Sequence, residues 1–357
     1  MKYTMLKEVC SIKMGQSPAS DSYNDNGKGV PFFQGNADFG ERYPVARKWC
    51  SAPLKMAEPE DILISVRAPI GALNYAKEEC CIGRGLAALT PNKSKVSPEF
   101  MFWLLKGKNT ELNSKGTGST FKAIGRKVLE EILVPDIGIE QQAEYSAILE
   151  KINGIIQLRK HELQKLDELI KARFIELFGD PIVNSMSWPE ELIGDSCFVT
   201  KLAGFEYTQY IHYKDSGDVV MVKAQNVKNG KLNRKDLSYI SKAVSDSLPR
   251  SQLLAGDVVM TYVGANIGDV AVIDDKYKYH LAPNVAKIRP NAEKYNSIYF
   301  MYMLMFLNSY IVGNSADTAK AALGMERIRK LKIFVPPIEL QEQFAAFVEQ
   351  VDKSKVA

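Results

Sequence analysis

The sequence predicts an α+β chain with two tandem mixed α/β domains that have β-rich cores, separated by long antiparallel coiled-coil-like helices. The first observation is an internal repeat. EDILISVRAPIG at 60–71 returns as GDVVMTYVGANIG at 256–268, about two hundred residues later, which is the scale of one domain plus a connector. The second is the proline-free segment 139–179, whose apolar residues recur at three- and four-residue steps.

Composition places the chain among ordinary globular proteins. It has 357 residues, 46% of them hydrophobic and 25% charged, which is enough apolar material for two cores. The net charge of +4 permits a nucleic-acid-binding face without requiring one. Residues 1–16 lack the apolar core of a signal peptide, and the most apolar stretch, 298–312, is shorter than the roughly 20 residues that span a bilayer. We therefore expect a cytoplasmic protein without a membrane partner.

Cysteine and histidine usage indicates neither a disulfide framework nor a zinc site. The 5 cysteines include no CxxC pair, as expected in a reducing compartment. The 3 histidines, His161, His212 and His280, lie far apart in the sequence and show no metal-ligand spacing. We expect each histidine on the surface or partly buried.

The first domain is predicted at 1–138. Short β-branched or aromatic runs at 30–33, 62–66 and 86–89 alternate with Gly, Pro, Asn and Asp, which indicates strands. A short helix is predicted at 98–106, with Pro98 in its first turn, and a strand at 132–135 closes the domain.

The connector at 139–179 is predicted to be one amphipathic helix. About 40 residues at 1.5 Å each give a rod of roughly 60 Å, and Gly154 is a weak point within it. Gly179 and Pro181 end the helix. A passive linker needs no apolar stripe, so the pattern favours a spacer that is also a docking surface.

The second domain is predicted at 180–337, with strands at 219–222, 258–262 and 270–273. One helix at 298–312 is the counterpart of 98–106, and a strand at 333–337 leads into a last helix at 338–357, about half as long as the first connector. Because a lone amphipathic helix exposes its apolar stripe, we expect the two connectors to pack antiparallel.

A search for catalytic motifs finds none. The chain has no P-loop, no glycine-rich dinucleotide fingerprint, no GxSxG and no Asn/Asp-Pro-Pro-aromatic motif of amino-methyltransferases. The sequence therefore predicts a binding protein without catalytic residues, cofactor or metal. A nuclease with an unrecognised active site stays open as the alternative, because nuclease carboxylates are hard to identify in one sequence.

Two loops at matching places carry groups suited to phosphate. KGTGSTFKAI at 115–124 combines small residues, which leave backbone N–H groups accessible, with hydroxyls and lysines. The counterpart is NSADTAKAALGMERIRK at 314–330. Such a loop alone is usually a turn, but its recurrence favours DNA contacts. The residues are Lys115, Ser119, Thr120 and Lys122 in the first copy and Thr318 and Lys320 in the second.

Side chains able to bond base edges also cluster at matching places. Asn and Gln can bond adenine, and Arg and Lys can bond guanine, in the major groove. The segment 32–43 offers Gln34, Asn36 and Arg42, and the segment 222–235 offers Lys223, Gln225, Asn226 and Lys228. Arg67, Arg84, Tyr262, Asn266 and Asn284 are the next candidates. A polar hairpin loop is the alternative reading for each of them. Because the copies differ at these positions, we expect two different half-sites.

These features together resemble the DNA-specificity subunit of type I restriction–modification systems. The match rests on ILISVRAPIG (62–71), GTGSTFKAI (116–124), the strand–Pro–EQQ segment (133–142) and ELIKARFIELFGDP (168–181), and VPPIELQEQF (335–344) repeats part of it. It covers nearly the whole chain, and the doubled architecture is more specific than any single motif.

The resemblance implies target-recognition domains at 1–138 and 180–337, each recognising one half of a split, asymmetric site in double-stranded DNA. It implies that the helices at 139–179 and 338–357 set the gap between half-sites and dock two modification subunits, which methylate adenine using S-adenosylmethionine. Restriction subunits that hydrolyse ATP join that complex. The chain departs from the family in its shorter second helix. A scaffold that binds only protein would leave the paired polar loops unexplained.

Overall fold

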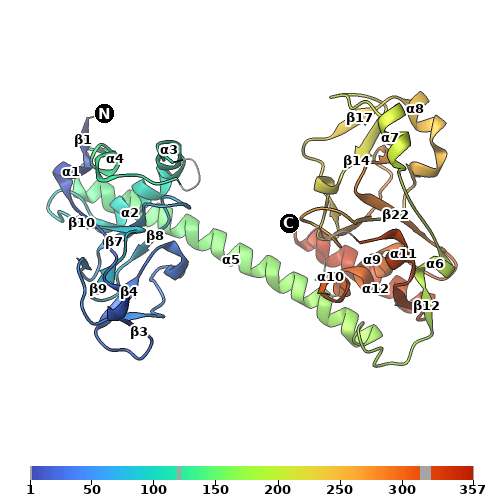
Figure 1. Ribbon diagram of the computed structural model, residues 1–357, viewed down its shortest axis with the longest axis horizontal. Helices are drawn as coiled ribbons and strands as arrows, with labels where there is room; N and C mark the ends of the chain where they lie inside the picture. The colour runs from blue at the N-terminus through green and yellow to red at the C-terminus, as the bar shows by residue number, and fades with distance from the viewer. Residues whose placement is uncertain (1, 119–121, 314–322, 357) are drawn as a thin grey trace. The chain divides into compact units, whose positions relative to one another are not determined.

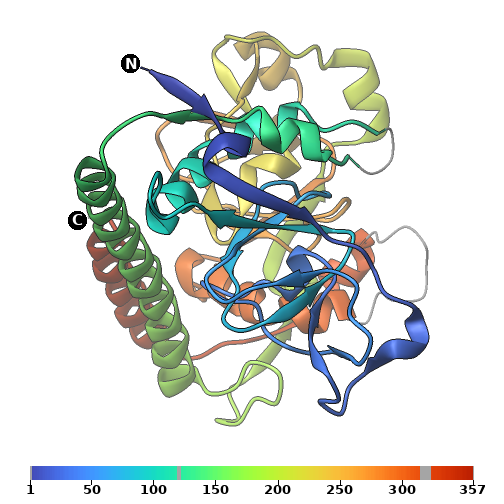
Figure 2. The same ribbon diagram turned by 90° about the vertical axis from the view of Figure 1, so that its left-hand side faces the viewer.

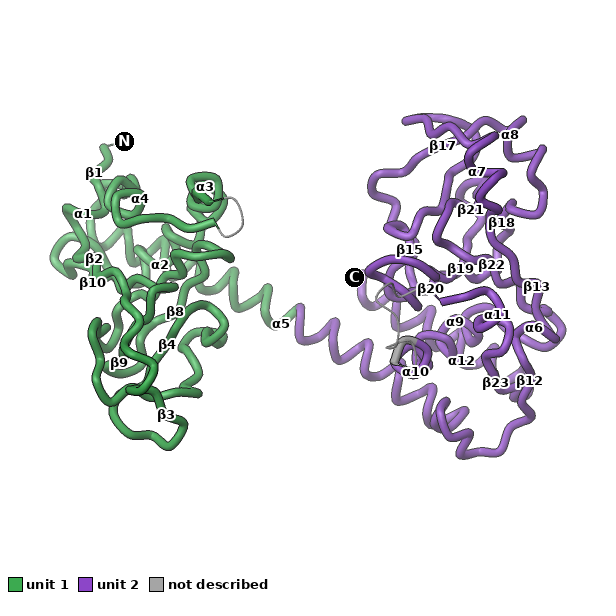
Figure 3. The backbone as a smooth tube through the Cα atoms, viewed as in Figure 1, with its two compact units in different colours: residues 1–159 green, residues 160–357 purple. Residues whose placement is uncertain are grey.

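The computed structural model describes residues 2–118, 122–313 and 323–356. The chain forms two compact units, residues 1–159 and 160–357, which Figure 3 shows in separate colours. The division falls inside the long helix α5 (Ile139–Phe178). We call residues 2–138 the N-terminal head and residues 180–337 the C-terminal head, and describe each unit by itself. No helix in the described ranges has both the length and the apolar character needed to cross a membrane.

The N-terminal head is built on three sheets (Figure 1). β1 (Tyr3–Met5) pairs with β11 (Leu133–Pro135), which brings the first and last strands of the head together. An antiparallel sheet of order β2-β10-β7-β8 comprises Cys10–Met14, Leu86–Pro91, Ile62–Ser65 and Leu73–Tyr75. A third sheet of order β3-β5-β4-β9-β6 comprises Tyr23–Asn24, Trp49–Cys50, Val30–Phe33, Cys80–Ile82 and Met56–Ala57. Within it, β4 and β9 run parallel.

Short helices cover the β2-β10-β7-β8 sheet. They are α1 (Leu6–Val9), α2 (Pro98–Gly107), α3 (Asn109–Ser114) and α4 (Arg126–Glu130). α2 begins where the Ser97 hydroxyl accepts a hydrogen bond from the Phe100 N–H, with Pro98 in the first turn. Its buried Met101 and Leu105 pack in one core with Ile64 of β7.

The C-terminal head repeats this frame. β12 (Glu190–Leu192) pairs with β23 (Lys332–Phe334). A sheet of order β13-β22-β19-β20 comprises Cys197–Lys201, Val285–Pro290, Val258–Thr261 and Val270–Val272. A sheet of order β17-β14-β21-β18 comprises Ser238–Ile240, Val219–Val222, Lys278–Leu281 and Gln252–Leu253, and β15 (Val227–Lys228) pairs with β16 (Lys231–Leu232). β14 and β21 run parallel, like β4 and β9.

The helices of the second unit are α6 (Ile193–Ser196), α7 (Gly204–Tyr210), α8 (Lys242–Ser247), α9 (Ser297–Phe306), α10 (Asn308–Gly313), α11 (Met325–Arg329) and α12 (Ile338–Ser354). The predicted single helix at 298–312 is wrong in one respect, because the chain breaks at Leu307 into α9 and α10. The first unit has the same break at Lys108, between α2 and α3. In both places an asparagine directly after the break lies against a glycine turn. Asn109 lies against Gly71, where an added Cβ would lie 2.7 Å from Asn109 Nδ2. Asn308 lies against Gly268, where an added Cβ would lie 2.3 Å from Asn308 Oδ1. The break brings each asparagine to its turn.

The long helix runs unbroken through Gly154 and ends at Phe178. Gly179 follows in the left-handed region (φ +79°), and its N–H donates to Ile175 O at 2.8 Å. In the second unit the last turns of α5 pack against α12, since Phe178 lies 5.7 Å from Phe344 and Lys355 bonds Asp167 at 2.7 Å. Later residues of one helix thus meet earlier residues of the other. The predicted antiparallel packing is confirmed here, and Figure 2 shows the two helices side by side.

A buried glutamine fixes each connector helix to its own head. Gln142 Oε1 accepts from the Ser97 N–H at 2.9 Å, and its Nε2 donates to Lys95 O and Ile137 O. Gln341 repeats all three bonds with Asn296, Lys294 and Pro336. The repeated Gln in the EQQ and LQEQ motifs therefore satisfies three backbone groups at the junction of head and helix.

Candidate nucleic-acid interface

In the N-terminal head, backbone hydrogen bonds draw four segments to one edge. The Gly85 N–H donates to Gln34 O at 3.1 Å and the Val66 N–H to Gly85 O at 2.9 Å. The Ile124 N–H donates to Val66 O at 2.9 Å. The end of β4, the β9–β10 turn, the end of β7 and the loop before α4 therefore meet. We call this the polar edge.

The C-terminal head forms its polar edge with equivalent bonds. The Ala282 N–H donates to Val222 O at 3.1 Å, as the Gly83 N–H donates to Phe33 O at 2.8 Å. The Tyr262 N–H donates to Asn284 O at 2.9 Å, and the Leu323 N–H donates to Tyr262 O at 2.8 Å. The candidates Tyr262 and Asn284 therefore occupy the places of Val66 and Gly85. In the first head, the candidate Arg67 directly follows Val66, and the candidate Arg84 directly precedes Gly85.

Gln34 and Arg84 lie together at the first polar edge. A Cβ on Gly85 would lie 2.4 Å from Gln34 O, so this close approach requires a residue without a side chain. The Gln34 Nε2 lies 3.0 Å from Ser17 Oγ, which also accepts from the Arg84 N–H at 3.3 Å. Gln34 and Arg84 are exposed. Ser17, absent from the sequence-based prediction, therefore orients the Gln34 amide. The turn-forming GQSP segment after β2 was its only signal.

Arg67 and Lys122 lie on neighbouring segments of the same edge. Arg67 forms a bridge with Ala123, and the Ala68 N–H donates to Lys122 O at 3.0 Å. Both side chains are exposed. Lys115 instead pairs with Glu111 at 2.7 Å, and hydrogen bonds from Lys108 and Lys115 lower the pKa of Glu111 to about 2. The predicted Ser119 and Thr120 lie outside the described residues, as do Thr318 and Lys320.

Two residues of the segment after β4 have different positions. Asn36 is half-buried and opens a 3₁₀ turn (Asn36–Asp38). Arg42 pairs with Glu150 of α5 at 3.2 Å, and its guanidinium lies 5.4 Å from the centre of the Tyr75 ring. Arg42 therefore contacts the connector helix of its own unit. Because both charges of the pair are about half exposed, it contributes little to stability.

In the second head, the residues after β14 divide into exposed and internally bonded groups. Gln225 and Lys228 are exposed. Lys223 Nζ donates to Asp236 O at 3.0 Å and Ser238 Oγ at 2.9 Å. Asn226 is 2% exposed, and its amide donates to Asn233 O at 2.9 Å and Lys235 O at 3.2 Å. Asn226 thus stabilises the loop, and its side chain has no free edge for a base.

The remaining candidates of the second head lie on turns. Asn266 and Asn284 are exposed, and Asn284 has a positive φ of 70°, which asparagine tolerates better than most residues. The ring of Tyr262 has the Lys201 ammonium 5.4 Å from its centre. Lys201, absent from the prediction, is an exposed cation at this edge. No motif marked it, because its position depends on β13 pairing with β22.

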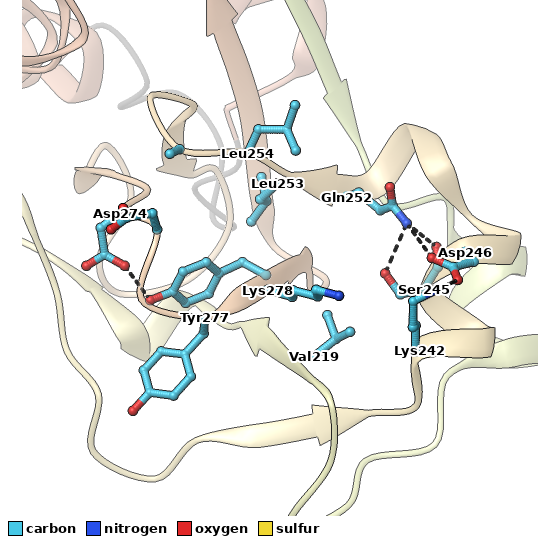
Figure 4. Close-up of a pocket in the computed structure, with 13 residues that line it drawn as sticks. Val219, Lys242, Ser245, Asp246, Gln252, Leu253, Leu254, Asp274, Tyr277 and Lys278 are labelled. Atoms are coloured by element: carbon cyan, nitrogen blue, oxygen red, sulfur yellow. Dashed lines mark hydrogen bonds and ion pairs between the residues drawn. The ribbon is translucent and has the colours of Figure 1, made fainter.

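A hollow of about 340 Å³ lies beside Val219 and Lys278, the first residues of β14 and β21 (Figure 4). These are the strand ends farther from the polar edge. Several of the hollow's polar groups bond one another. The Tyr279 hydroxyl donates to Asp274 Oδ1 at 2.7 Å, and Gln252 Nε2 donates to Ser245 O at 3.1 Å. Burial raises the pKa of Tyr279 to about 12, so the phenol remains a donor at neutral pH.

Within residues 2–118, 122–313 and 323–356, no cluster of three or more His, Cys, Asp or Glu side chains suits a metal ion. His280 is fully buried, so the expectation that each histidine lies on the surface or is only partly buried is wrong for it, and burial lowers its pKa. The cysteines are free, and burial raises the pKa of Cys10 to about 12. That thiol is therefore protonated at neutral pH.

Comparisons with known proteins agree with the repeated frame. A protein named as the type I restriction enzyme MjaX specificity subunit of Methanocaldococcus jannaschii is 44% identical over 160 residues, 45% of this chain. That match covers only 38% of the relative's length. The EcoBI specificity subunit of Escherichia coli is 20% identical and matches 97% of this chain and 78% of its own.

Similarity to solved structures concerns the fold. The crystal structure of a type I restriction–modification S subunit from M. genitalium aligns with 99% of this chain and 90% of its own, with a TM-score of 0.57 and 14% identity. At that identity, the likeness shows the fold alone. The family model described as type I restriction modification DNA specificity domain matches residues 1–168 and 199–357. The chain therefore belongs to the family of type I restriction–modification DNA specificity domains.

Proposed function

We propose that this chain is the DNA-recognition subunit of a type I restriction–modification complex, with target-recognition domains at 1–138 and 180–337. Each domain contacts one half of a split, asymmetric site. The observation that carries the proposal is the polar edge. Equivalent backbone bonds gather the same segments in both heads, while the side chains there differ. A shared frame with different polar groups suits two different half-sites.

The side chains divide by the chemistry they offer to DNA. Gln34, Arg67 and Arg84 in the first head can bond base edges. In the second head, Gln225, Asn266 and Asn284 offer amides, Lys223 and Lys228 offer cations, and Tyr262 offers a ring. Lys115, Ser119, Thr120, Lys122, Thr318 and Lys320 serve as phosphate contacts. We assign Asn226 and Arg42 to positioning, because Asn226 is buried with its amide bonded inside the loop and Arg42 pairs with Glu150 of the connector helix.

The connectors, assigned to 139–179 and 338–357, set the spacing of the half-sites and dock two modification subunits. Support comes from the unbroken length of α5 and from its exposed apolar side chains, among them Ile148, Ile152 and Ile156. Methylation and ATP-dependent cleavage belong to the modification and restriction subunits, in the cytoplasm. The matched family and relatives are specificity proteins, so the alternative of a nuclease has no support from them.

Methylation mapping tests the proposal directly. The chain is expressed with its modification subunits, and methylated adenines are mapped across the genome. We expect a bipartite motif with two short half-sites around a fixed spacer. In binding assays, the assembled complex should prefer that motif over unrelated duplexes, with strong salt dependence. Equal affinity for unrelated duplexes would contradict the proposal.

The spacing role and the absence of catalysis have their own tests. Insertion of one helical turn in the exposed part of α5 should change the mapped spacer while both half-sites stay the same. An unchanged spacer refutes the spacing role. Incubation of the purified chain with DNA and magnesium should give no cleavage, and cleavage that copurifies with the chain would favour the nuclease.

A further inference from the structure

Beside its polar edge, the C-terminal head has a helix with no equivalent after β2 of the N-terminal head. β13 pairs Lys201 with Ala286, two residues after Asn284 of the polar edge. The Lys201 ammonium also lies 5.4 Å from the centre of the Tyr262 ring. α7 (Gly204–Tyr210) begins three residues after Lys201, and three residues of extended chain span about 10 Å. α7 therefore starts next to the polar edge.

One side of α7 is fixed to the head. The Glu206 side chain is only 15% exposed, and its carboxylate accepts from the Ala203 N–H at 2.9 Å and pairs with Arg250 at 3.3 Å. Tyr207 packs against the core of the β17-β14-β21-β18 sheet. Ile211, directly after the helix, is 7% exposed and belongs to the same core. These contacts determine which side of α7 faces the solvent.

The opposite side of α7 consists of exposed residues. Phe205 is 67% exposed, and Thr208 and Gln209 are exposed as well. Their spacing of three and four residues places them together on one side of the helix. The Thr208 hydroxyl donates to Phe205 O at 3.1 Å, so it bonds within its own helix. The Gln209 amide has no hydrogen bond to any described residue. We call these three residues the outer face of α7.

The N-terminal head is built differently at this place. Met14 ends β2 and pairs with β10 as Lys201 pairs with β22. Ser17, the third residue after Met14, contacts the polar edge through its hydroxyl, so Gly204 occupies the equivalent place. Beyond it, the chain of the first head forms one 3₁₀ turn (Ser20–Ser22), in which no side chain is apolar or carries an amide. The outer face of α7 is thus specific to the C-terminal head.

Resting on the function proposed above, we propose that α7 enters the major groove of the second half-site. There the Gln209 amide bonds the edge of an adenine, and Phe205 contacts the methyl group of a thymine. The major groove is about 12 Å wide and admits an α-helix, and these are the base groups that an amide and an apolar side chain recognise. Four residues of helix rise about 6 Å, close to two base-pair steps of about 3.4 Å. The two side chains therefore reach bases two steps apart.

The charge around α7 favours DNA over a protein partner. Glu206 is the only acidic residue in the segment 201–214, and Arg250 neutralises it. Lys201 and Lys214, at the two ends of that segment, are exposed. The exposed charge beside the outer face is thus positive, which suits contact with phosphates. An apolar protein partner would require a continuous apolar patch, whereas the outer face has one apolar side chain beside two polar ones.

Methylation mapping of variants tests the role of α7. In the complex with modification subunits, Gln209→Ala should relax one position of the second half-site and lower the affinity for the wild-type motif about tenfold. Phe205→Ala should relax another position of the same half-site. The first half-site is the internal control and should stay unchanged. Tyr277→Ala is the aromatic control and should retain both half-sites, because Tyr277 is 48% exposed but lines the hollow beside Val219.

Cross-linking tests the contact itself. In the same complex, Gln209→Cys should form a disulfide with a thiol tethered to a base of the second half-site, and none when the tether is in the first half-site. Background is low because four of the five natural cysteines are buried. Circular dichroism of each variant chain checks that it is folded.

The outcomes separate this inference from the function on which it rests. A wild-type complex that recognises a bipartite motif, with α7 variants that leave the second half-site unchanged and Gln209→Cys that forms no cross-link, overturns the role of α7 alone. Equal changes in both half-sites overturn it as well, because they indicate a general effect on the complex. A wild-type complex without a bipartite motif overturns both proposals.

Discussion

The two units share one frame but differ in how their connector helices are covered. Gln142 and Gln341 fix the helices to the heads with the same three backbone bonds. Yet Val351 of α12 is buried under the end of α5, while its counterpart Ile152 is half exposed. A second difference lies in the sheets, where Lys287 takes the place of Ala88, and both are buried. The two copies of the repeat therefore share their backbone geometry. The burial and charge of their equivalent side chains differ with the elements that pack against each copy.

Truncation of a buried ring near the end of α5 should have the largest effect. Phe174→Ala removes a fully buried ring that contacts Tyr299, Phe306 and Phe344, and should lower the free energy of unfolding by about 3–5 kcal/mol. Ile152→Ala should cost less than about 0.5 kcal/mol, because that side chain is about half exposed. Urea unfolding measures both losses of stability. Equal losses would contradict the claim that the two units differ in how their connector helices are covered.

The shared glutamines should show equal effects in the two units. Gln142→Leu and Gln341→Leu each leave one N–H and two carbonyls without their partner, for a cost of roughly 3 kcal/mol. Gln343→Leu, on the exposed face of α12, is the control and should be near neutral. A cost confined to one variant would mean that the junctions differ in strength despite their common geometry.

The buried lysine should give the second unit a pH dependence. Burial first, and then Arg289, lower the pKa of Lys287 to about 8, although its ammonium donates to Arg250 O at 2.6 Å and Gln252 O at 2.8 Å. Between about pH 8 and the ordinary lysine pKa of 10.5, the unfolded chain binds more protons, so stability rises with pH. The rise should be of the order of 2 kcal/mol.

Lys287→Met should abolish that rise, as measured by urea unfolding at pH values on both sides of the interval. The exposed Lys276→Met should retain it, which controls for the loss of one lysine from the same unit. An equal slope in the wild type and Lys287→Met would show that Lys287 is charged in the folded protein throughout the interval.

The smallest expected effect concerns DNA. In the complex with modification subunits, Lys122→Ala should weaken binding to all sequences and reduce the slope of log affinity against log salt by about 1. Lys93→Ala is the control, because Lys93 follows the opposite end of β10 and pairs with Glu60 at 2.7 Å. Similar losses of DNA affinity for both variants would contradict the assignment of the polar edge to the DNA interface.

Local patterns predicted the connector helices and several core strands, because each of these segments repeats a period that its own packing uses. The predicted strands at 30–33 and 219–222 are β4 and β14, and the proline-free segment ends at Gly179 as its chemistry requires. The repeat also located the segments that meet at the polar edges. The break at Leu307 escaped prediction because α9 and α10 are continuous in apolar pattern, and Asn308 meets Gly268 only in the folded head.

The sequence by itself determined the doubled frame, the long helix and the segments rich in polar groups, because periodicity and turn residues act over a few neighbours. The tertiary structure decided which of those polar groups are available. Asn226 and Gln225 are adjacent in the chain, yet one is buried in loop hydrogen bonds and the other is exposed. The same holds for the apolar side chains of α5, of which Phe174 is buried and Ile152 is about half exposed. Whether a side chain is free depends on partners distant in sequence, which no local pattern contains.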